Sequence, residues 1–182
     1  MANAKIKALM KEFEEVKKHA QYGFDILRTN ENISMVSAYI AYGHHERLDG
    51  SGYPDKLAGE KIHEYTRIVS VCDVYDALTS DRIYRKKLKP NEVYEYITSL
   101  GSHHFDQKVV DIFVRHVSIY PVGSGVVLNT KEKGLVVKTN ASMPTRPIVR
   151  VLYNGQNQKL SNYYELDLSK AAHLNILDAC EL

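Results

Sequence analysis

Hydrophobic residues recur at steps of three and four through most of the first 120 residues, which is the period of an amphipathic helix. One such stripe covers residues 9–27. A second covers residues 33–40, and one further four-residue step from Ile40 places His44 on the same inward face. More helices are predicted over residues 66–78, 90–100 and 106–120. The pattern therefore predicts a helical bundle with a histidine directed toward its interior.

Beyond Pro121 the helical period gives way to β-branched residues in short alternating runs, which are typical of strands. Asn154-Gly155 lies between two apolar runs and is a strong hairpin signal. The expected strands cover residues 126–128, 135–137, 148–153 and 163–166. We therefore predict a mainly α protein with a helical domain over residues 1–120 and a small β-rich C-terminal subdomain over residues 121–182.

The composition is that of a globular protein without a membrane span. Of 182 residues, 44% are hydrophobic and 25% are charged, and no window approaches the roughly 18 consecutive apolar residues of a transmembrane helix. No apolar run precedes a small-residue cleavage site at the N-terminus, so we expect a cytoplasmic location. A net charge of +2 gives no support for binding a nucleic acid polymer. Cys72 and Cys180 are far apart, and we expect two buried, unreactive thiols.

The run richest in chemically active side chains is Gly43-His-His-Glu-Arg-Leu-Asp-Gly-Ser-Gly-Tyr-Pro54, in which two imidazoles and two carboxylates precede a glycine-rich turn. Imidazole and carboxylate groups together bind divalent cations such as iron, manganese, nickel or zinc. His19 and Asp73 add one candidate ligand each from separate predicted helices. Taken singly, a helical histidine or aspartate is more often a solvated or hydrogen-bonded group than a ligand. The residue types alone therefore leave both interpretations open.

The order of these groups along the chain resembles the HD-GYP family. The resemblance covers about residues 10–120 and comprises His19, then His44-His45-Glu46, then Asp49-Gly-Ser-Gly-Tyr-Pro54, then Asp73-Val-Tyr-Asp-Ala-Leu-Thr-Ser80, then Arg82-Ile-Tyr-Arg85. It implies the all-helical fold of the HD superfamily around a centre of two or three metal ions. Iron or manganese is the expected metal, with nickel or zinc as alternatives. Ala20 stands where the family usually has proline after its histidine, and this departure removes no ligand.

The resemblance also implies roles for individual residues. It implies metal ligands at His19, His44, His45 and Asp73, and we expect His45 and Asp73 to be catalytic as well. It implies that Arg82 and Arg85 hold substrate phosphate, for which planar guanidinium groups are well shaped. The motif loop is expected to comprise Glu46, Asp49, Gly50, Gly52, Tyr53 and Pro54. This loop either contacts a GGDEF domain, the kind of domain that makes cyclic di-GMP, or is a rigid turn that closes the site.

The His-Asp pair that gives the family its name lies well before the position of His19. Only 18 residues precede His19 here, and they contain neither histidine nor aspartate. We therefore expect a helical bundle truncated at its N-terminus: a fragment, a natural late start, or one half of a domain completed by another copy. A site with one metal ion on four ligands stays open, as does a site without metal. Apolar faces left uncovered would favour a homodimer.

These observations lead to one principal functional hypothesis and two alternatives. The principal one is a metal-dependent cyclic di-GMP phosphodiesterase domain of HD-GYP type, incomplete in this chain and weakly active or inactive. The first alternative is a non-catalytic module of bacterial signalling that binds cyclic di-GMP or a GGDEF protein. The second is a general metal-dependent phosphohydrolase, because the metal chemistry does not by itself select a nucleotide. Metal analysis and incubation with cyclic di-GMP separate the three.

Overall fold

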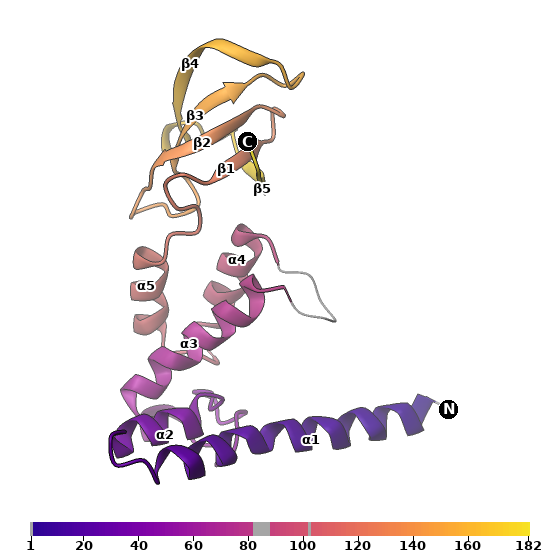
Figure 1. The fold of residues 1–182 in the computed structure, drawn as a ribbon, viewed down its shortest axis with the longest axis vertical. Helices are drawn as coiled ribbons and strands as arrows, with labels where there is room; N and C mark the ends of the chain where they lie inside the picture. The colour runs from indigo at the N-terminus through magenta and orange to yellow at the C-terminus, as the bar shows by residue number, and fades with distance from the viewer. Residues whose placement is uncertain (1, 82–87, 102) are drawn as a thin grey trace. The chain divides into compact units, whose positions relative to one another are not determined.

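A computed structural model describes residues 2–81, 88–101 and 103–182 of the chain (Figure 1). Contacts within the chain divide it into two compact units. The first unit comprises Met1–Ala77 with Ser99–Val110, and the second comprises Leu78–Thr98 with Asp111–Leu182. A division by contacts does not test where independently folding domains begin, so the domain boundary near residue 121 stays a prediction.

The described helices are α1 (Ala2–Leu27), α2 (Met35–Gly43), α3 (Glu64–Thr79), α4 (Pro90–Leu100) and α5 (Gln107–His116), with a short 3-10 helix, η1 (Gly59–Lys61), before α3. Each helix that the hydrophobic pattern predicts is confirmed. The last of them ends at His116 rather than near residue 120. The reason is that Ile119 and Tyr120 are buried in the core of the sheet instead of on a helical face.

Helices α1 and α2 lie side by side (Figure 1). His19 lies on α1, and His44 caps the C-terminal end of α2. Helix α2 begins at Ser34, whose hydroxyl accepts a hydrogen bond from the Ser37 amide and so caps the helix. Phe24 of α1 packs against Tyr39 and Tyr42 of α2, with ring centroids 5.0 and 5.4 Å apart. This aromatic contact sets the position of the end of α2 relative to α1.

The start of α3 is tied to the segment before α5 within the first unit. The Arg67 guanidinium donates to the Ile62 carbonyl at 2.8 Å and to the Asp106 carboxylate at 3.0 Å. Phe105 is buried beside them, and the Arg47 guanidinium lies 5.2 Å from the centre of its ring. These contacts join the start of α3 and Arg47 of the motif segment to the segment before α5.

The second unit contains a five-stranded antiparallel sheet in the order β4-β3-β2-β1-β5 (Figure 1). Its elements are β1 (Gly125–Leu128), β2 (Lys133–Lys138), β3 (Ile148–Tyr153), β4 (Lys159–Asp167), the 3-10 helix η2 (Leu168–Lys170) and β5 (Ile176–Cys180). The four predicted strands lie within β1 to β4, whereas the sequence pattern does not predict β5.

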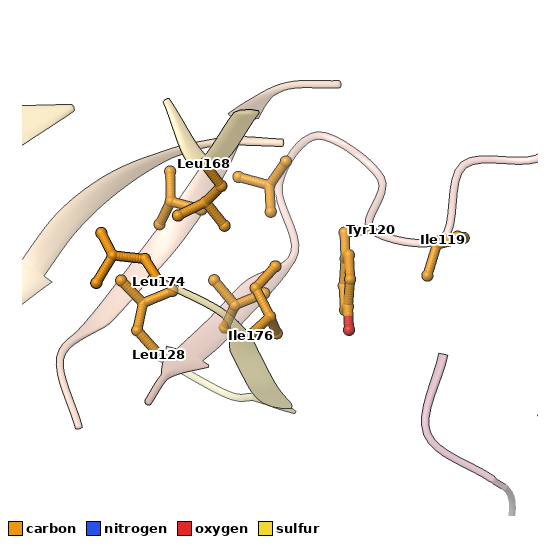
Figure 2. Close-up of a cluster of buried hydrophobic side chains, with 9 residues drawn as sticks. Ile119, Tyr120, Leu128, Leu168, Leu174 and Ile176 are labelled. Carbon is orange, nitrogen blue, oxygen red and sulfur yellow. The ribbon is translucent and has the colours of Figure 1, made fainter. Parts of the chain in front are cut away.

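One face of this sheet forms the core of the second unit (Figure 2). Inward positions alternate along β1 and β2, as expected for strands covered on one side. Gly134 is required at its position in β2, because a Cβ atom there would overlap the backbone of Arg150 on β3. The buried side chains are Ile119, Tyr120, Val126, Leu128, Val136, Val149, Leu168, Leu174 and Ile176.

Two sequence predictions are corrected by these observations. The description mainly α holds for the helical part only, because a complete five-stranded sheet follows it. Cys72 is exposed on α3 and Cys180 is half-buried, so the expectation of two buried thiols is wrong. Both are free thiols. Among the residues that the structure describes, no helix is both long enough and apolar enough to cross a membrane.

Candidate metal centre

Three of the predicted ligands come together in the first unit. His19 lies on α1, His44 is the residue that ends α2, and His45 follows it. Nε2 of His19 lies 3.3 Å from Nε2 of His44 and 3.1 Å from Nε2 of His45. Ligand atoms of all three side chains lie within 4.8 Å of one another. The three imidazoles therefore converge on one small volume.

Local backbone contacts set the tautomers of two of these rings. Nδ1 of His19 lies 2.6 Å from the carbonyl of Val16, and Nδ1 of His44 lies 2.7 Å from the carbonyl of Ala41, in each case three residues earlier. A carbonyl oxygen only accepts hydrogen bonds, so Nδ1 carries the hydrogen in both rings. In the neutral form of each ring, Nε2 then has a lone pair on the side of the shared volume, as a metal-ligating imidazole requires.

The spacing of the nitrogens fits a divalent cation. Two ligand nitrogens of a tetrahedral site with metal–nitrogen bonds of about 2.0–2.1 Å lie about 3.3 Å apart. The two separations involving His19 are 3.3 and 3.1 Å. Lone pairs that face each other at this distance repel unless a proton or a cation lies between them. The residues present therefore suit a nitrogen-bound first-row metal ion.

Asp73 of α3 lies next to this group rather than within it. Its Oδ2 atom is 3.8 Å from Nδ1 of His45, the ring nitrogen that faces away from His19. Burial, followed by the neighbouring His44, His19 and Arg47, lowers the pKa of His45 to about 3. His45 is therefore neutral at neutral pH, and its contact with Asp73 is not an ion pair. The ligand role of Asp73, like that of the three histidines, stays a prediction.

Glu46 has a structural task in the motif loop. Its side chain is buried, at 2% exposure. One carboxylate oxygen accepts a hydrogen bond from the Asp55 amide at 2.7 Å and the other accepts one from the Leu57 amide at 2.9 Å. Both oxygens thus hold the segment of residues 55–57, and Glu46 contributes no ligand atom to the histidine group. Sequence reasoning gave no indication of this task.

Glycines and an aspartate shape the rest of the loop. A Cβ atom on Gly52 would lie 2.5 Å from backbone atoms of His45, Glu46 and Arg47, so only glycine fits. Gly50 has φ of +78°. Hydrogen bonds from the hydroxyl and amide of Ser51 lower the pKa of Asp49 and fix it as the anchor of a tight turn.

Tyr53 and Pro54, joined by a cis peptide bond, bring the loop back over the histidines. The Tyr53 ring lies 4.6 Å from that of His45 at an angle of 32°, and 6.5 Å from that of His19. Burial raises the pKa of Tyr53. The Lys17 ammonium also lies near this ring, 5.5 Å from its centre. The tyrosine therefore covers one side of the histidine group.

Two further predicted residues, Arg82 and Arg85, lie outside the described residues. The structure in turn shows contributors that sequence reasoning missed. The Ser70 hydroxyl donates to the His44 carbonyl at 2.7 Å, and the Arg47 guanidinium donates to the same carbonyl at 3.2 Å. Ser70 is buried.

Comparison with known proteins gives matches over both parts of the chain. The sequence model of the HD domain matches residues 1–109, and that of the KOW domain associated with HD domain matches residues 125–182. A protein of Pseudomonas aeruginosa named as a cyclic di-GMP phosphodiesterase is 36% identical over 160 residues, which are 88% of this chain and 38% of that protein.

Shorter matches cover the helical part. The cyclic di-GMP phosphodiesterase response regulator RpfG of Xanthomonas campestris is 41% identical over 105 residues, which are 57% of this chain and 28% of that protein. A protein of Vibrio cholerae named as a 3'3'-cGAMP-specific phosphodiesterase is 36% identical over 106 residues, which are 58% of this chain and 20% of that protein. The chain thus spans well under half the length of these relatives.

Proposed function

Because this chain belongs to the HD domain family, and within it to the HD-GYP type, we propose that it is a metal-dependent phosphodiesterase domain acting on cyclic di-GMP. One observation supports the proposal most: three imidazoles whose ligand atoms lie within 4.8 Å of one another. The names of the relatives supply the substrate class. Because two relatives are named for 3'3'-cGAMP, we take a cyclic dinucleotide as the general class and cyclic di-GMP as its first member.

We assign the metal to His19, His44 and His45. Asp73 remains the proposed fourth ligand on the family resemblance alone, because its carboxylate lies 3.8 Å from Nδ1 of His45, on the far side of that ring from the shared volume. Iron or manganese remains the proposed ion, and nickel or zinc would also suit imidazole donors. When bound, such a cation supplies a water of lowered pKa and positive charge for the phosphodiester oxygens.

The protein groups around the ion position and screen it. Backbone carbonyls hold the rings of His19 and His44 in the ligand tautomer, and burial keeps His45 neutral. Tyr53 covers one side of the group and limits access of bulk water. Arg82 and Arg85 remain the proposed contacts to substrate phosphate.

We propose that this polypeptide alone turns over slowly or not at all. In the described part of the chain, the histidine group with Asp73 provides donors for one ion, whereas two-metal hydrolysis needs a second set. The same observation favours the alternative function, in which the chain binds a cyclic dinucleotide without cleaving it. A general phosphohydrolase remains the third and weakest proposal.

Two partners remain proposals as well, and so does a cytoplasmic location. A GGDEF domain would contact the motif loop, as the family resemblance suggests. A second copy of the chain would cover exposed apolar side chains on α1 and α3, where Phe13, Val16 and Ile68 are 53%, 59% and 45% exposed. Light scattering on the purified chain tests the dimer, and a monomeric mass at micromolar concentration argues against it.

The decisive experiment combines metal analysis with a substrate assay. The purified chain is loaded with Mn²⁺ or Fe²⁺ under anaerobic conditions, its metal content is measured, and it is incubated with cyclic di-GMP. We expect bound metal in the wild type and its loss in His45→Ala, because that variant removes one of three converging nitrogens. His173→Ala is the matched control, since His173 lies in the other unit.

The outcomes separate the three functions. Linear dinucleotide formed by the wild type and not by His45→Ala supports catalysis. Cyclic di-GMP binding without product supports the regulatory module. Hydrolysis of a simple phosphodiester but not of cyclic di-GMP supports the general phosphohydrolase. A wild-type chain that binds no metal, or an equal loss in His173→Ala, would refute the assignment of the metal to the three histidines.

A further inference from the structure

A lysine, a glutamate and two aromatic rings form a cluster where α1 meets the motif loop. The Lys17 ammonium lies 4.8 Å from the ring centre of Phe13 and 5.5 Å from that of Tyr53. The two rings meet edge to face, with their centroids 6.3 Å apart and an angle of 82° between them. The same ammonium donates a hydrogen bond of 2.7 Å to Glu14. We call these four residues the α1 platform, and all of them belong to the first unit.

The α1 platform adjoins the candidate metal centre through Tyr53. The Tyr53 ring lies 4.6 Å from the ring of His45 and 6.5 Å from that of His19. Lys17 precedes His19 by two residues on the same helix. A chemical group attached to a phosphate at the histidines can therefore lie on the platform.

Phe13 provides a stacking surface beside this centre. The residue is 53% exposed, although it lies next to Tyr53 and Lys17. An exposed aromatic ring on a nucleotide-binding surface stacks with a nucleobase, and it does so with any base because every base has a π face. Stacking on Phe13 therefore contributes affinity, whereas a choice between bases needs polar groups at the edge of the base.

The ion pair beside Phe13 offers a donor and an acceptor side by side. An ammonium has three hydrogens, and the contact with Glu14 uses one of the three on Lys17. Within the described residues, the second carboxylate oxygen of Glu14 has no hydrogen-bond partner. Guanine presents an acceptor, O6, next to the donors N1–H and N2–H₂, whereas adenine presents the donor N6–H₂ next to an acceptor. The pair of Lys17 and Glu14 therefore matches the edge of guanine and opposes that of adenine.

We propose that the α1 platform binds a guanine base of the cyclic dinucleotide and selects it over adenine. The base stacks on Phe13 and accepts a hydrogen bond from Lys17 at O6. The Glu14 carboxylate accepts hydrogen bonds from N1–H and N2–H₂. A base is uncharged, so an ion pair without net charge suits it. That the base belongs to a cyclic dinucleotide rests on the proposed function, whereas the preference for guanine follows from the platform itself.

A second ion pair on the same helix is a matched control. Lys18 lies 2.7 Å from Glu15, and the two are again three residues apart. In the part of the chain that the structure describes, Lys18 lies over no aromatic ring. The same two charges are thus present there without a stacking surface, and variants of this pair should not change the choice of base.

Equilibrium binding to the whole metal-free chain tests the proposal, because nothing is cleaved without metal. Cyclic di-GMP and cyclic di-AMP are titrated by calorimetry, since they share the phosphate ring and differ in the base. The wild type should bind cyclic di-GMP about ten-fold more tightly, which is the order of discrimination that a matched pair of polar contacts to a base provides. Phe13 is one of 4 phenylalanines in the chain, and its ring proton signals should shift in NMR spectra until the site is saturated.

Variants separate the polar contacts from stacking. Lys17→Met and Glu14→Ala should each bring the ratio of the two affinities toward one. Lys18→Met and Glu15→Ala should leave this ratio at its wild-type value. Phe13→Ala should weaken both nucleotides by about ten-fold, because stacking contributes to the binding of either base. Phe13→Tyr keeps an aromatic ring and should retain wild-type affinity, which distinguishes lost stacking from a disturbed helix.

Equal affinities of the wild type for the two nucleotides overturn the proposal, and so does a preference for guanine that Lys17→Met leaves unchanged. Binding without a shift of the Phe13 ring signals overturns it as well, as does the absence of binding at millimolar concentration. None of these measurements uses metal or turnover. Metal content and linear product in the presence of Mn²⁺ report on the proposed function separately, so failure of the platform and failure of that function are distinguishable.

Discussion

Replacing Glu46 with glutamine tests whether the motif loop is held by a buried carboxylate. In the wild type both carboxylate oxygens accept backbone hydrogen bonds, from Asp55 at 2.7 Å and from Leu57 at 2.9 Å. Glutamine has nearly the same shape but only one acceptor oxygen, and its amide group presents hydrogens to the second backbone N–H. One charge-assisted hydrogen bond is therefore lost and one buried donor is left unpaired.

The expected cost follows from these two changes. A hydrogen bond to a charged group contributes about 1.5–3 kcal/mol, and a buried unsatisfied donor costs about 1–3 kcal/mol, with partial relaxation of the loop reducing the sum. We expect the Glu46→Gln variant to lose roughly 2–4 kcal/mol. For a chain of this size a loss of that order lowers the thermal midpoint of the helical unit by roughly 4–16 °C.

Urea denaturation followed by circular dichroism measures the loss, and amide hydrogen exchange at Asp55 and Leu57 reports whether the loop itself has opened. Glu60→Gln is the matched control, because Glu60 lies on η1 of the same segment with an exposed side chain. If Glu46→Gln unfolds at the wild-type urea concentration and both amides still exchange slowly, the carboxylate does not hold the loop and the reasoning fails.

Three further predictions concern other contacts. Gly52→Ala should weaken Co²⁺ binding by about ten-fold or more in a spectroscopic titration, because its Cβ meets backbone atoms at 2.5 Å, whereas Gly23→Ala, with open space around it, should not. Arg146→Met should destabilise the sheet unit by about 2–4 kcal/mol in urea, because its guanidinium donates to the carbonyls of Leu168, Ala171 and Leu174. Arg150→Met removes only an exposed ion pair with Glu165 and should cost about 0–1 kcal/mol. Burial raises the pKa of Asp106, but hydrogen bonds from Arg67 and two amides outweigh it and hold that pKa below its usual value. The resulting stability is present above about pH 4 and is lost as the pH falls through the folded-state pKa, so Asp106→Asn should flatten the fall in urea midpoint between pH 5 and about pH 3.

Local patterns predicted the fold where each element buries one regular face. The stripe over residues 9–27 lies within α1, and the run over residues 148–153 coincides with β3. The same reasoning failed where apolar residues that continue a helical spacing pack against a different element. Ile119 and Tyr120 continue a helical spacing, yet they are buried in the core of the sheet. Strand β5 was not predicted because its own sequence shows no clear strand pattern. It forms by pairing with β1, some fifty residues earlier in the chain.

The candidate site was predictable to the level of residue types and order. Order along the chain indicated that His19, His44 and His45 belong together, and the structure brings them to within 4.8 Å. The sequence could not predict the direction of each ring nitrogen, because that direction depends on a backbone carbonyl near His19 and near His44. The role of Glu46 was hidden for a related reason: a carboxylate that accepts two amides from a returning loop has the same sequence signature as a ligand.

The orientation of the histidine rings and the distance between them depend on different contacts in this chain. Each of His19 and His44 takes its tautomer from a carbonyl three residues earlier, so this property needs only the local helical backbone. Their approach to 3.3 Å instead depends on how α1 packs against α2, where Phe24 contacts Tyr39 and Tyr42. A disturbance of that aromatic contact would leave every ring prepared as a ligand and yet move the lone pairs apart. Metal affinity should therefore depend on the packing of these two helices as well as on the presence of each of the three imidazoles.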